Sequence, residues 1–116
     1  MKALVLQSLH RPLEYTEVAD PVPSGEMAVV ALRAAALNHR DVYITKGLYS
    51  GIKFPVIPGS DGAGEWQGKP VVIYPALDWG DHPHFQGKQF RVLGMPDDGT
   101  FAEQIAVPKA HVFPMP

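Results

Sequence analysis

Residues 36–49 read ALNHRDVYITKGLY and describe a strand that gives way to a short helix. Asn38 is a residue type that caps helices, so a helix is predicted over His39–Thr45. Gly47 stands where a C-terminal glycine would end that helix. The pattern therefore places Asn38 and Asp41 together at a strand-to-helix junction.

The rest of the chain has the pattern of short strands. Met27–Leu37 is the longest apolar run, and its valines favour a central strand, although Ala34–Ala36 would also tolerate a helix. Shorter strand patterns occur at Lys2–Gln7, Leu13–Val18, Glu65–Trp66, Lys69–Tyr74 and Ala102–Val107. Gln67-Gly68 predicts a tight hairpin turn between two of them. The 12 prolines and 11 glycines argue against long helices, so a mainly β fold is predicted.

Composition and charge exclude several classes of protein. A chain of 116 residues with 46% hydrophobic residues fits one domain with an apolar core. Its formal net charge of -2 offers neither a basic surface for nucleic acid nor a polybasic membrane anchor, so neither partner is expected. The absence of cysteine removes disulfides, thiolate nucleophiles and thiolate metal ligands. Without a signal peptide or a long apolar span, a cytoplasmic location is expected.

Two segments have an unusual composition. Gly59–Gly64 holds three glycines that let the backbone pass close to another surface, so we expect a packed crossing or a ligand wall. It lacks the context of a dinucleotide fingerprint, because a hairpin strand rather than a helix follows it. Pro75–Gly99 is too long for an ordinary connection and is expected to be functional or to form a lobe. Within it, residues 78–84 carry two His and two Asp. Their spacing matches no established metal-ligand pattern, so a solvated polar loop is favoured.

Together these features resemble the N-terminal, GroES-like catalytic domain of medium-chain dehydrogenases/reductases. Residues 36–49 are similar to the Leu-Asn-x-x-Asp and x-Gly-x-Tyr signature of the quinone oxidoreductase branch. Residues 54–65, which read FPVIPGSDGAGE, are similar to the family's proline and glycine framework, and residues 99–108 to its closing strand. The resemblance covers essentially the whole chain and implies a partly open β-barrel with one or two short helices.

The resemblance also bears on metals. Members that use catalytic zinc carry Cys at the position of Asn38 and a His-Glu pair at Ser60-Asp61, which supply the ligands that Zn²⁺ needs. Members with a structural zinc carry several Cys in the lobe that corresponds to Pro75–Gly99. This chain has none of these ligands, so no zinc is expected.

The function that the resemblance implies is NADPH-dependent reduction of a quinone or an enone, with hydride transfer from the reduced nicotinamide. It assigns catalytic positions to Asn38, Asp41, Tyr43 and Tyr49, and it places Asn38, His39, Arg40 and Asp41 beside the cofactor. A Tyr hydroxyl or the Asn amide would donate a hydrogen bond to the developing enolate oxygen. The alternative interpretation of the residues is that Asn38 is simply a helix cap and that the tyrosines occupy half-buried packing positions. His39 is more often structural or exposed than catalytic at such a position.

Relatives of this kind continue into a Rossmann domain, whereas this sequence ends at Pro116. Residues 1–116 are therefore expected to form a single GroES-like domain that binds NADPH poorly by itself. Such a domain would be inactive or weakly active unless a Rossmann domain joins it in trans. The alternative is a stand-alone module that binds a small molecule or self-associates, and a homodimer through the uncovered cleft face is expected. A co-chaperonin role is the least favoured, because no flexible loop with an apolar anchor is present.

Overall fold

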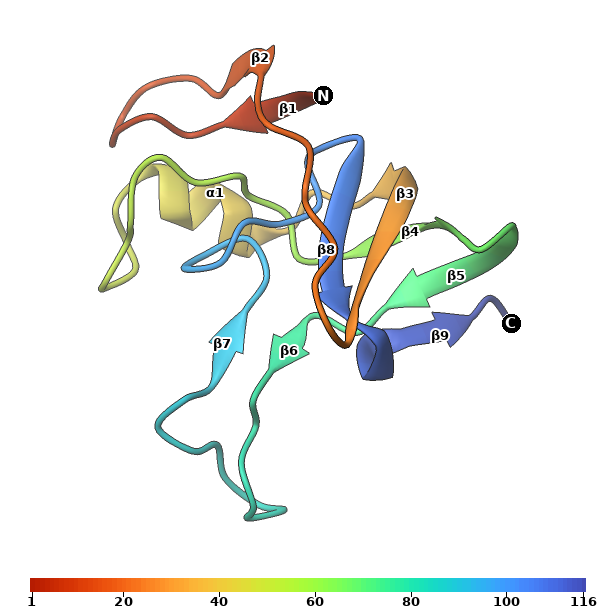
Figure 1. The fold of residues 1–116 in the computed structure, drawn as a ribbon. Helices are drawn as coiled ribbons and strands as arrows, with labels where there is room; N and C mark the ends of the chain where they lie inside the picture. The colour runs from red at the N-terminus through yellow and green to blue at the C-terminus, as the bar shows by residue number, and fades with distance from the viewer.

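A curled antiparallel sheet forms the body of the molecule. The computed structural model describes residues 1–116, and its five main strands have the order β8-β3-β4-β5-β9 (Figure 1). The bounds of these strands are β3 Met27–Ala35, β4 Gly62–Trp66, β5 Lys69–Ile73, β8 Gln104–Pro108 and β9 Val112–Pro114. The sheet curls into a half-barrel, so the prediction of a mainly β, partly open barrel is confirmed.

Shorter elements surround this sheet. Strand β1 (Lys2–Val5) pairs with β2 (Glu14–Glu17), and β6 (Ala76–Leu77) pairs with β7 (Arg91–Val92). The single α-helix, α1, spans His39–Thr45, and one turn of 3-10 helix, η1 (Lys109–His111), precedes β9. No helix in the structure is long and apolar enough to cross a bilayer.

Most of the predicted elements are confirmed, with small shifts at their ends. The apolar run that begins at Met27 forms the strand β3, because its alternating side chains pack on one face of the sheet. The helix after Asn38 occupies the predicted residues. β4 and β5 form the predicted hairpin, and its turn residues Gln67 and Gly68 have φ values of 52° and 75°. Two successive left-handed residues are what a tight hairpin turn requires.

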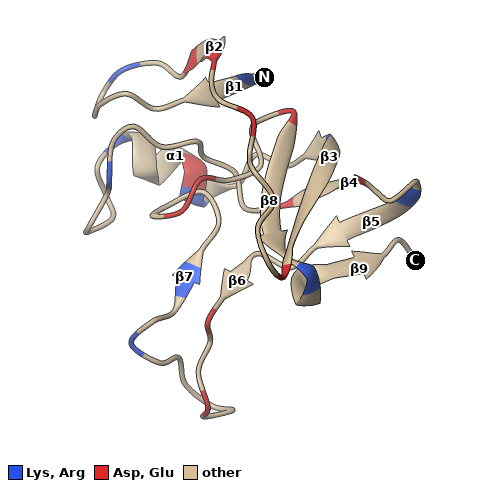
Figure 2. Ribbon diagram, viewed as in Figure 1, with Lys and Arg blue, Asp and Glu red and all other residues tan.

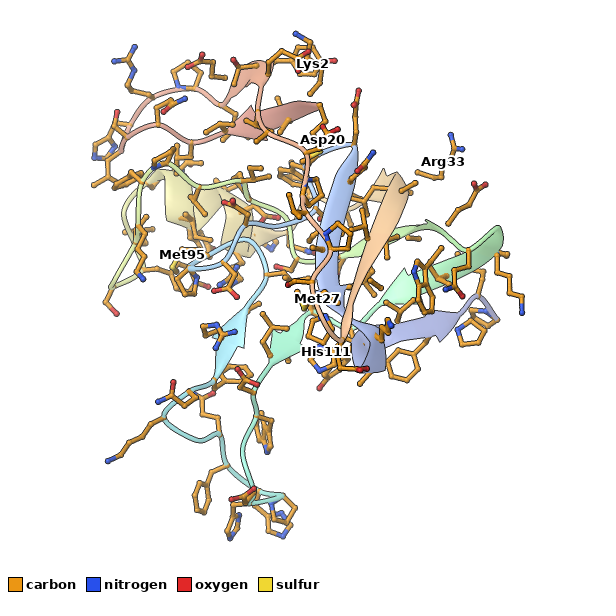
Figure 3. The ribbon with its side chains drawn as sticks, in the orientation of Figure 1. Lys2, Asp20, Met27, Arg33, Met95 and His111 are labelled. Atoms are coloured by element: carbon orange, nitrogen blue, oxygen red, sulfur yellow. The ribbon has the colours of Figure 1, made fainter.

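Two apolar clusters fix the sheet and the helix in place. The larger cluster joins strands of the sheet to the base of the lobe and consists of Val30, Val71, Ile73, Leu77, Leu93, Ile105 and Val107. The second joins α1 to β1 and its surroundings through Leu6, Ile44, Val56 and Met95. Figure 3 shows Met95 close to α1. Because Ile44 and Leu6 are fully buried, moving the helix would expose side chains that each contribute about 2 kcal/mol.

The chain crosses itself at a glycine-rich contact. The N–H of Gly99 donates to the carbonyl of Ile57 at 2.7 Å, and the N–H of Thr100 donates to the carbonyl of Gly59 at 2.9 Å. A Cβ on Gly99 would overlap the carbonyl oxygen of Gly59. The packed crossing predicted for Gly59–Gly64 is thus confirmed, and its opposite side is formed by the residues that lead into β8.

Pro75–Gly99 forms the predicted lobe, which projects from the sheet at the bottom of Figure 1. Arg91 holds its base: Nε donates to both carboxylate oxygens of Asp97 at 3.1 Å, and Nη1 donates to Asp78 at 2.7 Å. The hydrogen bond to Asp97, followed by that to Asp78, raises the pKa of Arg91 above its ordinary value. No group of three or more His, Asp or Glu side chains in the protein is arranged to hold a metal ion. The hydrogen-bonded ion pairs of Arg91 with Asp97 and Asp78 fasten the base of the lobe.

Charged residues are scattered over the molecule. Figure 2 shows Lys and Arg at separate loops and strands, interspersed with Asp and Glu. Arg33 of β3 pairs with Glu65 of β4 at 3.3 Å, and Lys2 of β1 pairs with Glu17 of β2 at 3.4 Å. Such exposed cross-strand pairs contribute little to stability. The sheet is thus held mainly by its ladders and its apolar clusters.

The crossing yields the first testable prediction. Replacing Gly99→Ala is expected to lower the free energy of unfolding by about 2–3 kcal/mol, because the added methyl meets backbone that cannot move aside. Urea unfolding followed by tryptophan fluorescence measures this change. Gly68→Ala is the matched control: a Cβ there meets nothing within 4 Å. Its cost is limited to about 1–2 kcal/mol of left-handed backbone strain. Equal losses in the two variants would contradict the close crossing.

Candidate functional site at the strand-to-helix junction

The buried carboxylate of Asp41 organises the junction between β3 and α1. Asp41 is 2% exposed. Its Oδ2 accepts the backbone N–H of Asn38 at 2.9 Å, and its Oδ1 accepts the backbone N–H of Gly59 at 3.1 Å. Asn38 and Asp41 form a capping box at the start of α1. One carboxylate therefore caps the helix and ties it to the glycine crossing, which gives Asp41 a positioning role.

Asn38 lies against a carboxylate from a distant part of the chain. Its Nδ2 donates to Oδ2 of Asp61 at 2.7 Å, across 23 positions of sequence and in contact with solvent. The backbone carbonyl of Asp61 in turn accepts the hydroxyl of the buried Thr100 at 2.8 Å. The crossing thus brings an amide and a carboxylate together as a hydrogen-bonded pair at the surface.

A shallow hollow adjoins this pair. Its volume is about 260 Å³ and its lining consists of Ala34, Ala35, Ala36, Asp61, Gly62 and Ala63. The small side chains leave an apolar shelf with one carboxylate at its edge. Directly before Asp61, the hydroxyl oxygen of Ser60 is buried and has no hydrogen-bond partner in the protein. Such an unsatisfied group marks a place where the protein forgoes stability, which is common at functional sites.

The structure divides the other four predicted site residues into two pairs. His39 stacks with Tyr43 one helical turn away, with ring centroids 6.1 Å apart, and Tyr43 is 43% exposed. The guanidinium of Arg40 lies 5.6 Å from the ring centroid of Tyr49. Both tyrosines are thus accessible from solvent, and each accompanies a neighbouring basic residue.

Arg40 is directed toward the protein rather than toward the shelf. Its Nη2 donates to the carbonyl of Met95 at 2.6 Å and its Nη1 to the carbonyl of Leu93 at 3.3 Å. Burial lowers the pKa of Arg40, and electrostatic interactions with Tyr49 and Asp41 act in the opposite direction. Arg40 therefore ties α1 to the chain that returns from the lobe.

The residues at the junction do not fit a zinc ion. Tetrahedral zinc takes thiolate, imidazole and carboxylate ligands. Asn38 directs its Nδ2 at Asp61, and an amide nitrogen of this kind is a donor without a lone pair for a metal. Ser60 supplies only a hydroxyl, so Asp61 is the single ordinary zinc ligand of the three. The hydrogen-bonded pair thus offers one carboxylate and no second ordinary zinc ligand.

Asp61 and Thr100 are the site residues that the sequence patterns alone did not identify. A signal for Asp61 lay in the resemblance, which implies that Ser60-Asp61 corresponds to a ligand pair in zinc-using members. No sequence pattern points to Thr100, whose contact with Asp61 depends on the crossing of two distant segments.

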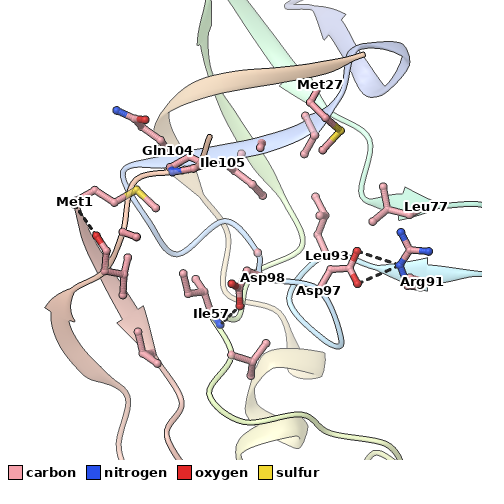
Figure 4. Close-up of a pocket in the computed structure, with 18 of the residues that line it drawn as sticks. Met1, Met27, Ile57, Leu77, Arg91, Leu93, Asp97, Asp98, Gln104 and Ile105 are labelled. Atoms are coloured by element: carbon pink, nitrogen blue, oxygen red, sulfur yellow. Dashed lines mark hydrogen bonds and ion pairs between the residues drawn. The ribbon is translucent and has the colours of Figure 1, made fainter. Parts of the chain in front are cut away.

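A larger cavity lies elsewhere in the fold, beside β8. Its volume is about 530 Å³, and its lining is largely apolar and includes Met27, Ile57, Leu77, Leu93 and Ile105. Figure 4 shows these side chains with the Arg91–Asp97 ion pair at one side of the cavity. None of the predicted site residues lines it. It is therefore separate from the Asn38–Asp61 pair.

Removing the charge of Asp41 tests its positioning role. Asp41→Asn is expected to lower the free energy of unfolding by about 2–3 kcal/mol, because the amide cannot accept from both backbone N–H groups without turning its own N–H toward one of them. Urea unfolding is again the measurement. Asp81→Asn is the control, since Asp81 is an exposed lobe residue, and surface changes of this kind stay within about 0.5 kcal/mol. A loss for Asp41→Asn within that range would contradict the role.

Comparison with known proteins shows the family. Residues 24–116 match the alcohol dehydrogenase GroES-like domain. A zinc-type alcohol dehydrogenase-like protein of Schizosaccharomyces pombe, C1773.06c, is 54% identical over 55 residues, which are 47% of this chain and 15% of that protein.

Solved structures agree with this match. The crystal structure of an NAD-dependent alcohol dehydrogenase superposes with a TM-score of 0.91 at 32% identity, over 100% of this chain and 40% of the other. The quinone oxidoreductase from Thermus thermophilus, whose complex with NADPH is also known, superposes with a TM-score of 0.75 at 28% identity, over 100% of this chain and 32% of the other. The chain thus spans less than half the length of these proteins. It belongs to the alcohol dehydrogenase GroES-like domain family of the medium-chain dehydrogenases/reductases.

Proposed function

We propose that this chain is the catalytic-domain portion of a cytoplasmic, zinc-free, NADPH-dependent reductase of quinones or enones. The observation that carries the proposal is the Asn38–Asp61 pair, in which the amide nitrogen of Asn38 donates to the carboxylate of Asp61 at 2.7 Å. The resemblance to zinc-using members implies that these positions correspond to zinc ligands there. The similarity to the quinone oxidoreductase over the full chain supports the same interpretation. Reduction of a conjugated carbonyl needs a hydrogen-bond donor for the oxygen that gains charge, and a side-chain amide supplies one without a metal.

In this proposal, the residues of the chain have separate roles in binding the substrate and in positioning the site. Asn38 donates to the oxygen of the substrate, while Asp41 holds Asn38 and the crossing in place. Tyr43 and Tyr49 shape the substrate side of the cleft as exposed aromatic rings. The cofactor, when bound, supplies the hydride. The apolar shelf beside Asp61 would receive the ring of the quinone or enone.

The phosphates of the cofactor would be held by another domain. The shelf is lined by alanines, glycine and Asp61 and offers no cation, and Arg40 donates to the carbonyls of Leu93 and Met95 instead. Pyrophosphate is usually held by glycines and a helix N-terminus of a Rossmann domain. The chain alone would therefore bind NADPH weakly and need such a domain, in cis or in trans, for activity.

A second candidate function is self-association or small-molecule binding without catalysis. Leu37 and Leu48, which flank α1, are 72% and 66% exposed, and Tyr43 lies between them in sequence. Exposed apolar side chains of this size favour a partner surface. A homodimer through this face would cover the site residues, and the cavity beside β8 would suit a small apolar molecule.

The reductase proposal is tested with NADPH. Residues 1–116 alone are expected to show no saturable change in tryptophan fluorescence on NADPH addition. Fusion to the Rossmann domain of a quinone oxidoreductase is expected to give enone-dependent loss of NADPH absorbance. Asn38→Ala in the fusion should lower kcat/KM about 100-fold, as for loss of one oxyanion donor, whereas Asp81→Ala should leave it unchanged. A fusion that binds NADPH but reduces neither quinone nor enone would contradict the proposal.

The dimer is tested by light scattering. If the chain dimerises through the exposed leucines that flank α1, the double variant Leu37→Ser/Leu48→Ser is expected to raise the dissociation constant of the dimer about tenfold or more. Each substitution removes apolar surface that the dimer would bury. Val22→Ser is the control, since Val22 is 80% exposed and lies in the loop between β2 and β3. A parent chain that scatters only as a monomer at working concentration would overturn the dimer.

A further inference from the structure

One of the two N–H groups of the Asn38 side-chain amide has no acceptor in the protein. A side-chain amide nitrogen carries two N–H groups. One donates to Oδ2 of Asp61 at 2.7 Å, and no other atom of the protein accepts from this nitrogen. The bond is in contact with solvent, so a ligand can approach the pair. The second N–H is therefore available to an acceptor that the protein itself does not provide.

The backbone of each residue in the pair is hydrogen-bonded to a buried side chain. The backbone N–H of Asn38 is fixed by the buried carboxylate of Asp41. The carbonyl of Asp61 is fixed by the hydroxyl of Thr100, which is 1% exposed. A Cβ at the next residue, Gly62, would meet Thr100 and Leu32 at under 3.0 Å, so this side of the crossing is closely packed. A donor held by its neighbours loses little freedom when it binds, which strengthens a single hydrogen bond.

The negative charge of Asp61 limits which ligands can bind beside Asn38. Asp61 is exposed, and neither of its carboxylate oxygens pairs with a Lys or Arg side chain. The hollow beside it contains no charged residue other than Asp61. An anionic ligand whose oxygen reached the free N–H would come within a few Å of this carboxylate and be repelled. A neutral carbonyl oxygen would not.

We propose that Asn38 and Asp61 form a metal-free recognition pair for neutral conjugated carbonyl compounds, in which Asn38 donates to the carbonyl oxygen and Asp61 orients the amide and rejects carboxylates. This inference rests on the proposed function for its ligand class. It adds Asp61 to the site as a positioning and specificity-determining residue. The alanine shelf next to Asp61 receives the apolar ring of the ligand.

The sequence makes this pair directly observable. Asn38 is the only asparagine in the chain. Labelling asparagine with ¹⁵N therefore gives a single side-chain NH₂ signal in an NMR spectrum, with two resolved protons. The neutral probe is 2-cyclohexen-1-one, and the anionic probe of similar size is cyclohex-1-ene-1-carboxylate. The ketone is expected to shift the Asn38 side-chain protons in a saturable manner, and the carboxylate is expected to bind about tenfold more weakly or worse.

The variant Asp61→Ala distinguishes a role of Asp61 in orienting the Asn38 amide from a purely structural role. In this variant the ketone is expected to bind about tenfold more weakly, because the amide is no longer held. The carboxylate should bind more tightly than to the parent, since the repelling charge is gone, and a merely structural role for Asp61 would not produce that reversal. Asp81→Ala, an exposed lobe variant, should leave both affinities unchanged.

Two outcomes would overturn the pair. A ketone that shifts other resonances of the uniformly labelled chain while the Asn38 side chain stays unmoved would overturn the recognition pair, whereas NADPH oxidation by the fusion protein decides separately whether the domain supports reduction. Equal affinities of parent and Asp61→Ala for both probes would remove the selectivity of Asp61. Loss of NADPH oxidation in the fusion protein, with the NMR shifts intact, would instead contradict the proposed function and leave the recognition pair in place.

Discussion

The carboxylate of Asp41 is the contact on which the site geometry depends. It is buried, and it accepts one backbone N–H from the start of α1 and one from Gly59. Asn38 precedes the helix and Asp61 follows the glycine, so the two halves of the recognition pair are set by the same group. A buried carboxylate with both oxygens bonded to backbone is much less adaptable than one that faces solvent. The geometry of the pair is therefore a property of the fold and not of a ligand.

Side-chain hydrogen bonds hold two places in this chain. At the junction, the amide of Asn38 donates to the carboxylate of Asp61. In the lobe, Arg91 donates to both carboxylate oxygens of Asp97 and to Asp78. The two contacts differ in setting. Arg91 fastens the base of a projecting segment, whereas the Asn38–Asp61 pair is in contact with solvent and can meet a ligand. Under the proposed function, an amide donor would suit substrates that are already activated by conjugation, because it is a weaker electrophile than a metal.

The sequence was sufficient for the elements but only partly for the site. Local signals determine the helix after Asn38 and the hairpin turn at Gln67-Gly68, because capping and left-handed φ depend on neighbouring residues. The position of Asp61 against Asn38 follows from a contact across 23 positions that no local pattern encodes. The inward orientation of Arg40 likewise depends on the lobe returning to α1. Composition alone would assign that guanidinium to a phosphate as readily as to a carbonyl.

Site geometry and cofactor affinity are separable in this fold. Every hydrogen bond that shapes the pair joins residues within 38–100, so the arrangement needs no second domain. Affinity for a dinucleotide, in contrast, comes mostly from contacts to its phosphates, and the shelf beside Asp61 has no cation to provide them. Under the proposed function, the half-barrel would carry the selectivity for the reacting carbonyl, and the domain placed beside it would set the strength of cofactor binding. Changes in either part could then alter one property without disturbing the other.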